Sequence, residues 1–187
     1  VINMSLGSLT PCSDFERDVY SAVVASGVTV VVSAGNDGND QPTGAPANCP
    51  GVIAVGAAGP TFELAFYSNF ADDIVTIVAP GGDGSGNFDP SESVLSVDGS
   101  TDNDYYALDG TSMAAPHVSG GVSLMQAVNP RLSPAQVKTI LARSPFTCGG
   151  AGCNDVAYLD APSAVQLAAS TPGELTGNEP PPGAGSA

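Results

Sequence analysis

Val28-Thr29-Val30-Val31-Val32 is the stretch of the sequence that decides the fold. Its residues are β-branched and almost all apolar, without the polar–apolar alternation of a strand that has one face in water. Such a run is typical of a strand covered on both faces. The preceding segment predicts a helix, because Ser13 and Glu16 form a capping box and Gly27 suits a helix end. A doubly covered strand directly after a helix indicates an α/β fold.

Three further segments extend this pattern into a sheet. Residues 52–55 and 74–78 repeat the continuous apolar run, and residues 1–6 predict a buried strand before the first helix. Strands that alternate with helices and lack a polar face favour a parallel sheet with helices on both sides. The predicted fold class is therefore α/β, a three-layer αβα arrangement around a mostly parallel sheet.

A long helix is predicted in the C-terminal half. It begins near Thr111 or Ser112, because Pro116 is tolerated only in the first turn of a helix. The residues at helical spacing that would face the core are Val118, Val122 and Met125. Before it, residues 81–104 predict a long surface loop around a short strand at residues 94–97.

Two shorter helices and a tail complete the chain. A second capping box at residues 133–136 opens a helix to about residue 143, and Asp160 opens a last helix that ends near residue 169. Residues 170–187 are rich in Pro, Gly, Ser and Glu without apolar periodicity, so they predict a linker or tail. Residues 1–169 are expected to belong to one domain.

The charge balance excludes whole classes of partner. The 187 residues include 4 Lys+Arg and 19 Asp+Glu, which gives a formal net charge of −15. Binding nucleic acid through its phosphates needs a basic face, and docking on an anionic membrane surface needs basic residues too. The longest apolar runs are also far shorter than a membrane span.

Four cysteines, Cys12, Cys49, Cys148 and Cys153, form an even set that allows three pairings. No pair has C-x-x-C spacing, and the single His117 gives no Cys/His zinc pattern. Disulfides and hence an oxidising compartment are the favoured interpretation, with four buried free thiols as the alternative.

Ser112 is the sharpest candidate for chemistry. It lies at the start of the predicted long helix, where free backbone N–H groups and the helix dipole favour negative charge. An oxyanion formed there could accept a hydrogen bond from the N–H of Ser112 itself. The alternative is a plain serine N-cap, which is the commoner use of serine at such a position.

Several ordered motifs resemble the subtilisin-like serine proteases, the subtilases. Residues 110–120, GTSMAAPHVSG, resemble the nucleophile segment of that family. Residues 31–38, VVSAGNDG, resemble its oxyanion-hole segment, and residues 1–7, VINMSLG, resemble the strand that pairs with bound peptide. Segments in the same style and order are VIAVGA at 52–57, YSNF at 67–70 and VAPG at 78–81. The resemblance covers about residues 1–169.

The resemblance implies a role for each matching position. Ser112 would be the nucleophile, and Asn36 would donate its amide to the oxyanion together with the Ser112 N–H. The walls of the substrate cleft would be formed by Ser5, Leu6, Gly7, Ser33, Ala34 and Gly35. The cysteine placement is similar to that of secreted bacterial members with disulfides Cys12–Cys49 and Cys148–Cys153.

The substrate preference follows from the size of the residues around this cleft. Small residues at Gly35, Gly44 and Ala47 would leave a roomy, apolar S1 pocket. We therefore expect large hydrophobic or aromatic P1 residues to be preferred. Asp37 at the rim would also tolerate a basic P1 side chain.

A base for the serine is missing. His117 lies five residues after Ser112 on the same predicted helix, so at about 100° per residue it points roughly 140° away. Subtilisin-like enzymes carry the triad in the order Asp, His, Ser, which places the Asp and His before Val1. The chain is therefore expected to be the C-terminal part of a catalytic domain, poorly stable and inactive without its N-terminal part. The alternative is a pseudoprotease that binds peptides without cleaving them.

Calcium is the only metal for which the sequence gives a pattern. Asp98, Ser100, Asp102 and Asp104 place oxygen ligands at alternate positions, as in a calcium loop. Asn103 replaces the sharp-turn glycine of that loop and Asp109 its terminal glutamate, so we interpret the run as a solvated loop. No cofactor is expected for catalysis. The resemblance leaves a structural calcium elsewhere open.

Overall fold

The computed structural model describes residues 1–38, 40–70, 73–84, 91–97, 104–150, 153 and 155–173. Four parallel strands form one sheet in the order in which they occur along the chain. These strands are β1 (Ile2–Met4), β2 (Val30–Ser33), β3 (Ile53–Ala58) and β4 (Val75–Pro80). The parallel sheet predicted from the apolar runs is confirmed.

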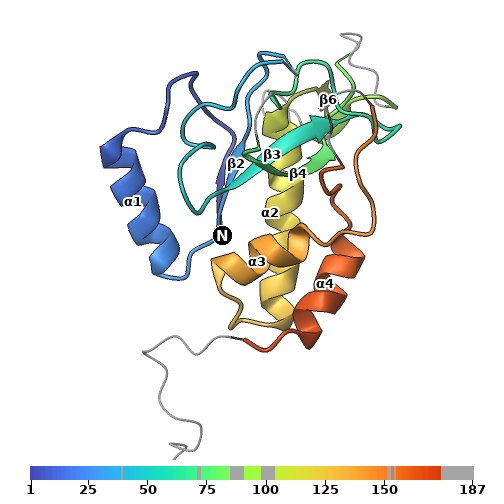
Figure 1. Ribbon diagram of the computed structural model, residues 1–187. Helices are drawn as coiled ribbons and strands as arrows, with labels where there is room; N and C mark the ends of the chain where they lie inside the picture. Colours follow the sequence, from blue (N-terminus) through green and yellow to red (C-terminus); the bar gives the residue numbers. More distant parts are fainter. Residues whose placement is uncertain are drawn as a thin grey trace, which may run out of the picture.

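Helices cover both faces of this sheet (Figure 1), as the three-layer prediction requires. On β2, Val31 packs into the same cluster as Val118 and Val122 of α2 (Thr111–Val128). Val30 and Val32 pack on the opposite face, near Tyr20, Val23 and Val24 of α1 (Asp14–Ala25). Successive strand side chains point to opposite faces, so the continuous apolar run serves two cores.

The larger core lies between the sheet and three helices. The stripe Val118, Val122 and Met125 of α2 is completely buried, as predicted. Helices α3 (Pro134–Leu141) and α4 (Ala161–Ser170) join α2 on this side. Figure 1 shows these three helices as one group, with α1 standing apart from them. Helix α3 ends two residues short of the predicted end, and residues 174–187 of the predicted tail lie outside the described residues.

The N-terminal elements are less buried than the sequence predicts. Strand β1 spans three residues, shorter than the predicted strand at 1–6, and Ile2 is 42% exposed. Helix α1 has no buried residue, and its Val19 is 40% exposed. The prediction of a buried strand was wrong, because an apolar sequence does not show whether a covering element lies beside it.

A hairpin precedes α2. Strand β5 (Val94–Val97) has the predicted bounds, and it pairs antiparallel with β6 (Tyr105–Leu108). The sequence analysis did not predict this pairing. Most of the run that has a calcium-loop pattern, and that we interpret as a solvated loop, lies at residues 98–103, outside the described residues.

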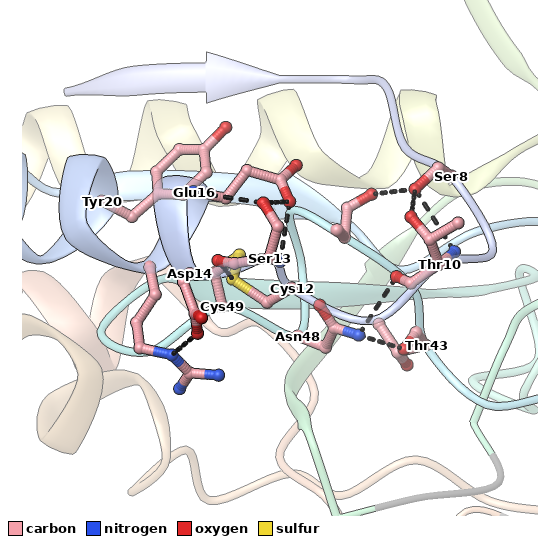
Figure 2. The surroundings of a disulfide bond; sticks show 12 residues. Ser8, Thr10, Cys12, Ser13, Asp14, Glu16, Tyr20, Thr43, Asn48 and Cys49 are labelled. Carbon is pink, nitrogen blue, oxygen red and sulfur yellow. Dashed lines mark hydrogen bonds and ion pairs between the residues drawn. A yellow bond between two sulfur atoms is a disulfide. The ribbon is translucent and has the colours of Figure 1, made fainter.

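Both predicted disulfides are present. Cys12 is bonded to Cys49, and Cys148 to Cys153. Figure 2 shows the Cys12–Cys49 bond next to the start of α1. There the Ser13 N–H donates to Glu16 Oε2 over 2.9 Å, and the Glu16 N–H donates to Ser13 Oγ over 3.3 Å, which is the predicted capping box. A second box joins Ser133 and Gln136 at the start of α3.

Candidate active site

The candidate site lies where the carboxyl ends of β1 and β2 meet the N-terminus of α2. Ligands of parallel sheets bind at this edge. Ser112 is the second residue of α2, directly after the helix cap Gly110 and Thr111. A side chain at Gly110 would lie 3.2 Å from Asn36 Nδ2, and Gly110 has φ +152°. Glycine at the cap therefore allows the loop after β2 to approach the start of α2 closely.

Thr111 holds the side chain of Asn36 in one orientation. The backbone N–H of Thr111 donates to Asn36 Oδ1 over 2.9 Å, and the Thr111 hydroxyl donates to the same oxygen over 2.7 Å. The hydroxyl in turn accepts the Gly35 N–H over 3.2 Å. Because two donors fix the carbonyl oxygen of Asn36, its NH₂ group faces away from Thr111 and is left to donate elsewhere.

The sequence analysis missed this role of Thr111. The side chain is 1% exposed, which is unusual for a hydroxyl residue. Its place directly before Ser112 is visible in the sequence, but its partners are 75 residues away. No local pattern could have indicated this bond.

Ser112 itself has few partners. Its Oγ lies 3.5 Å from the main-chain oxygen of Ser5 in the segment after β1. His117 is exposed, and its Nδ1 lies 2.8 Å from the main-chain oxygen of Met113, one turn before it. A carbonyl can only accept, so Nδ1 carries a proton there. This bond holds the ring against its own helix, which agrees with the prediction that His117 is not the base.

A hollow of about 220 Å³ opens beside these groups. Among its lining residues are five of the six predicted cleft residues, namely Leu6, Gly7, Ser33, Ala34 and Gly35, together with Asn36, Asp37, Gly44 and Ser112. Ser5, the sixth, contacts Ser112 but is not part of this lining.

Ala47 is placed differently from our expectation. It is buried in the cluster with Val30 and Val32 under the α1 face of the sheet, and it does not line the hollow. Gly44 does line it, and a side chain there would collide with the main chain of Ser8. The prediction of pocket size therefore rests on Gly35 and Gly44 alone.

Hydrogen bonds to Asn69 hold the loop after β2 in place. Asn69 Oδ1 accepts the Asp37 N–H over 2.7 Å, and Asn69 Nδ2 donates to Asp37 Oδ2 over 3.0 Å. Asn69 is 1% exposed, so both bonds form in a protected setting. They fix the segment that carries Asn36 and leave Asp37 at the rim of the hollow.

No metal centre is evident in the part of the chain that the structure describes. Within it, no group of three or more His, Cys, Asp or Glu side chains is arranged to hold a metal ion. Asp109, the last position of the run with a calcium-loop pattern, has buried carboxylate oxygens without a hydrogen-bond partner among the residues that the structure describes. Burial raises the pKa of the nearby Tyr67 hydroxyl well above its usual range, and the Asp109 carboxylate adds to this shift.

A serine at a helix N-terminus, an oriented asparagine amide and an adjoining hollow are the features expected of the nucleophile half of a serine hydrolase site. The comparisons with known proteins agree. The model of the subtilase family, peptidase S8, matches residues 1–165. The chain therefore belongs to the subtilase family and has a subtilisin-like α/β fold.

Individual relatives are bacterial proteases. The chain is 41% identical over 173 residues to an extracellular protease of Xanthomonas campestris, covering 90% of this chain and 28% of that protein. It is 37% identical over 152 residues to subtilisin DY of Bacillus licheniformis, covering 80% and 50%. Among solved structures, a protease of Pseudoalteromonas arctica superimposes with a TM-score of 0.81 at 35% identity, covering 89% and 50%. The chain thus spans half or less of the length of these relatives.

Proposed function

We propose that this chain is the nucleophile-bearing part of an extracellular serine endopeptidase. It would act together with an Asp and a His supplied by the N-terminal part of the same catalytic domain. The observation that carries the proposal is the orientation of Asn36, whose carbonyl oxygen accepts two hydrogen bonds from Thr111. Such fixation serves an amide that must donate to a charge formed beside Ser112.

The mechanism assigns one task to each group. Ser112 Oγ attacks the peptide carbonyl carbon, while the histidine supplied by the N-terminal part takes the hydroxyl proton. The carbonyl oxygen becomes an oxyanion that accepts hydrogen bonds from the Ser112 N–H and Asn36 Nδ2. The histidine then protonates the leaving amine, the C–N bond breaks, and an acyl-enzyme on Ser112 remains. Water hydrolyses this ester in the same way.

Substrate binding would use the two segments that line the hollow. Residues 5–7 after β1 and residues 33–35 after β2 would pair with an extended peptide as an added strand. The P1 side chain would enter the hollow beside Gly35 and Gly44, which favours large hydrophobic or aromatic residues. Asp37 at the rim would also accept a basic P1 residue. Best turnover at P1 Gly or Asp in a peptide library would contradict this assignment.

Two observations support the extracellular setting. The two disulfides are stable only where the environment is oxidising. The Xanthomonas relative is itself described as an extracellular protease. Within the described residues, no helix is both long enough and apolar enough to cross a membrane.

One observation favours a second candidate, a pseudoprotease that binds peptides. The only histidine of the sequence, His117, is held by the Met113 carbonyl and cannot serve Ser112. If no base is supplied from elsewhere, the cleft could hold a peptide but not cleave it.

A fluorophosphonate probe distinguishes the two candidates. The protein, expressed in the longest form that its gene encodes, is treated with the probe and its intact mass is measured under denaturing conditions. A single adduct that is lost in Ser112→Ala supports the protease. Peptide binding without an adduct supports the pseudoprotease.

Asn36→Leu tests the oxyanion role separately. We expect kcat to fall by about 10²–10³ with little change in KM, the range that loss of one oxyanion donor produces in a subtilisin. An unchanged kcat would contradict the assignment of Asn36.

A further inference from the structure

The nucleophile helix contains a proline where a backbone donor is required. Pro116 lies in the second turn of α2, beyond the first turn to which we expected it to be confined. In a regular helix the N–H of residue 116 would donate to the carbonyl of residue 112, but proline has no N–H. The carbonyl oxygen of Ser112 therefore lacks its usual partner inside the helix.

A side chain from another element supplies the hydrogen bond. The hydroxyl of Ser5, in the segment after β1, donates to the Ser112 carbonyl oxygen over 2.8 Å. The main-chain oxygen of Ser5 lies 3.5 Å from the Ser112 hydroxyl. One residue of the substrate-binding segment thus contacts the nucleophile residue at both its main chain and its side chain.

Two more residues extend this contact into a chain of hydrogen bonds. Asn3 Nδ2 donates to Ser5 Oγ over 3.0 Å, and Ser119 Oγ donates to Asn3 Oδ1 over 2.9 Å. The chain leaves α2 at Ser119, crosses β1, and returns to α2 at Ser112. We call Ser119, Asn3 and Ser5 the relay.

The relay has only one consistent set of proton positions. The Ser112 carbonyl can only accept, so the single hydroxyl proton of Ser5 points at it. Ser5 Oγ must then accept from the NH₂ group of Asn3, which turns the Asn3 carbonyl toward Ser119. In its contact with Asn3 Oδ1, Ser119 can only be the donor, and while it donates there it cannot donate to the Ala115 carbonyl 3.1 Å away. Each bond thus fixes the orientation of the next.

We propose that Asn3 and Ser119 are positioning residues, which through Ser5 hold the nucleophile Ser112 in register with the substrate-binding segment. This inference rests on the proposed protease function. The relay replaces the helix bond that Pro116 cannot make, and it ties β1 to the first three turns of α2. Without it, Ser112 and the segment that binds the peptide would move independently, and attack geometry tolerates little displacement.

The test compares two serines of one helix. Ser119→Ala removes the relay donor. Ser123→Ala is the matched control, because the Ser123 hydroxyl lies one turn further along and donates to the carbonyl of its own helix, at Ser119, over 2.9 Å. We expect Ser119→Ala to lower kcat by about threefold to tenfold, the effect of one net hydrogen bond, with an unchanged KM and a Tm close to that of Ser123→Ala, which also loses one hydrogen bond. Ser119→Thr keeps a hydroxyl and should restore kcat.

A double-mutant cycle with Pro116→Ala sharpens this test. Alanine at position 116 returns an N–H to the Ser112 carbonyl, so the relay should become dispensable. The effect of Ser119→Ala on kcat should then be smaller in the Pro116→Ala background than in the wild type. Equal effects in both backgrounds would overturn the relay, as would equal kcat values for Ser119→Ala and Ser123→Ala.

A second readout separates this inference from the proposed function. If the wild type neither reacts with a fluorophosphonate nor cleaves peptides, the protease proposal fails, and the relay is judged by the ¹⁵N resonance of the Asn3 side-chain amide. Ser119→Ala should shift this resonance, and Ser123→Ala should leave it in place. No shift with Ser119→Ala would overturn the relay whatever the activity.

Discussion

Strands β1 and β3 belong to the same parallel sheet and differ sharply in burial. All six residues of β3 are buried, whereas two of the three residues of β1 are exposed. Strand β3 lies between β2 and β4, while β1 pairs only with β2 among the described strands. Coverage by neighbours, and not the apolar character of a segment, determines how much a strand contributes to the core.

Helices α1 and α3 repeat this contrast. Both begin with a serine capping box, but α1 has no buried residue and α3 has four, Pro134, Val137, Ile140 and Leu141. The same capping box at the start of a helix therefore does not determine how much of that helix is buried. The more exposed region, β1 with α1, leads into one of the two proposed substrate-binding segments, residues 5–7, whereas β3 and α3 contribute buried residues to the core.

The largest difference in the free energy of unfolding is expected between alanine substitutions of two isoleucines. Ile53 on β3 is 1% exposed and Ile2 on β1 is 42% exposed. Ile53→Ala should lower the free energy of unfolding by about 2–5 kcal/mol, because it leaves a cavity in the core. Ile2→Ala should cost less than about 1 kcal/mol. Urea denaturation with disulfides intact measures both.

Ile53→Val serves as the graded control and should cost about 0.5–1.5 kcal/mol. If Ile2→Ala cost as much as Ile53→Ala, β1 would be covered in solution by something that the described residues do not include. That result would contradict the conclusion that β1 is less covered than β3.

This contrast also defines what the sequence could predict. The β-branched run of β2 and the helical stripe of α2 were predictable, because strand and helix periodicity are local properties. Ser112 and Asn36 could be singled out because their motifs are local as well. The role of Thr111 and the relay from Ser119 to Ser5 could not, since the hydrogen bonds that tie them to other elements join residues 75 to 116 positions apart.

The next largest difference in stability is expected between phenylalanine substitutions of two tyrosines, Tyr67 in the covered part of the molecule and Tyr20 on the exposed helix α1. The Tyr67 hydroxyl is buried, 2.7 Å from the Gly81 carbonyl oxygen and 2.9 Å from that of Gly82. Tyr67→Phe should cost about 1–3 kcal/mol, because carbonyls buried in the core lose a donor. Tyr20 on α1 is half-buried, with its hydroxyl 3.6 Å from the Met4 sulfur, and Tyr20→Phe should stay within about 0.5 kcal/mol.

Alkaline pH tests the contribution of the Tyr67 hydroxyl to stability without changing any packing. Burial raises the pKa of Tyr67, so its hydroxyl stays protonated in the folded chain when it would ionise in the unfolded chain. This contribution is complete below the ordinary tyrosine pKa of about 10 and is lost as pH rises above it. Stability should therefore fall between about pH 10 and 11, and less so in Tyr67→Phe. Equal slopes in both proteins would contradict this account.

A smaller difference is expected between the two capping serines. Ser133→Ala should cost about 0.5–2 kcal/mol, because α3 is packed into the core and its start cannot loosen alone. Ser13→Ala should shift the global unfolding midpoint less, since α1 can fray without exposing buried residues. Urea midpoints of the two variants measure this. A larger shift for Ser13→Ala would show that α1 unfolds together with the core.

The smallest expected effect is a difference in pH dependence between the capping boxes of α1 and α3. Hydrogen bonds from the Ser13 side chain and backbone lower the pKa of Glu16 below its ordinary value of 4.5. A lowered pKa means that the carboxylate stabilises the helix start above about pH 4.5, and that this contribution is lost as pH falls through the lowered value. Gln136 occupies the same position in α3 and cannot titrate.

Hydrogen exchange can follow both boxes in one sample. Between pH 6 and pH 3, corrected for intrinsic rates, the protection of the Ser13 N–H should fall, because protonated Glu16 is a poorer acceptor. The Ser133 N–H, which donates to Gln136 Oε1 over 3.0 Å, should keep its protection. Glu16→Gln should make α1 behave like α3. If the Ser13 N–H of that variant still lost protection in acid, the pH dependence would arise from the weak coverage of α1 and not from its cap.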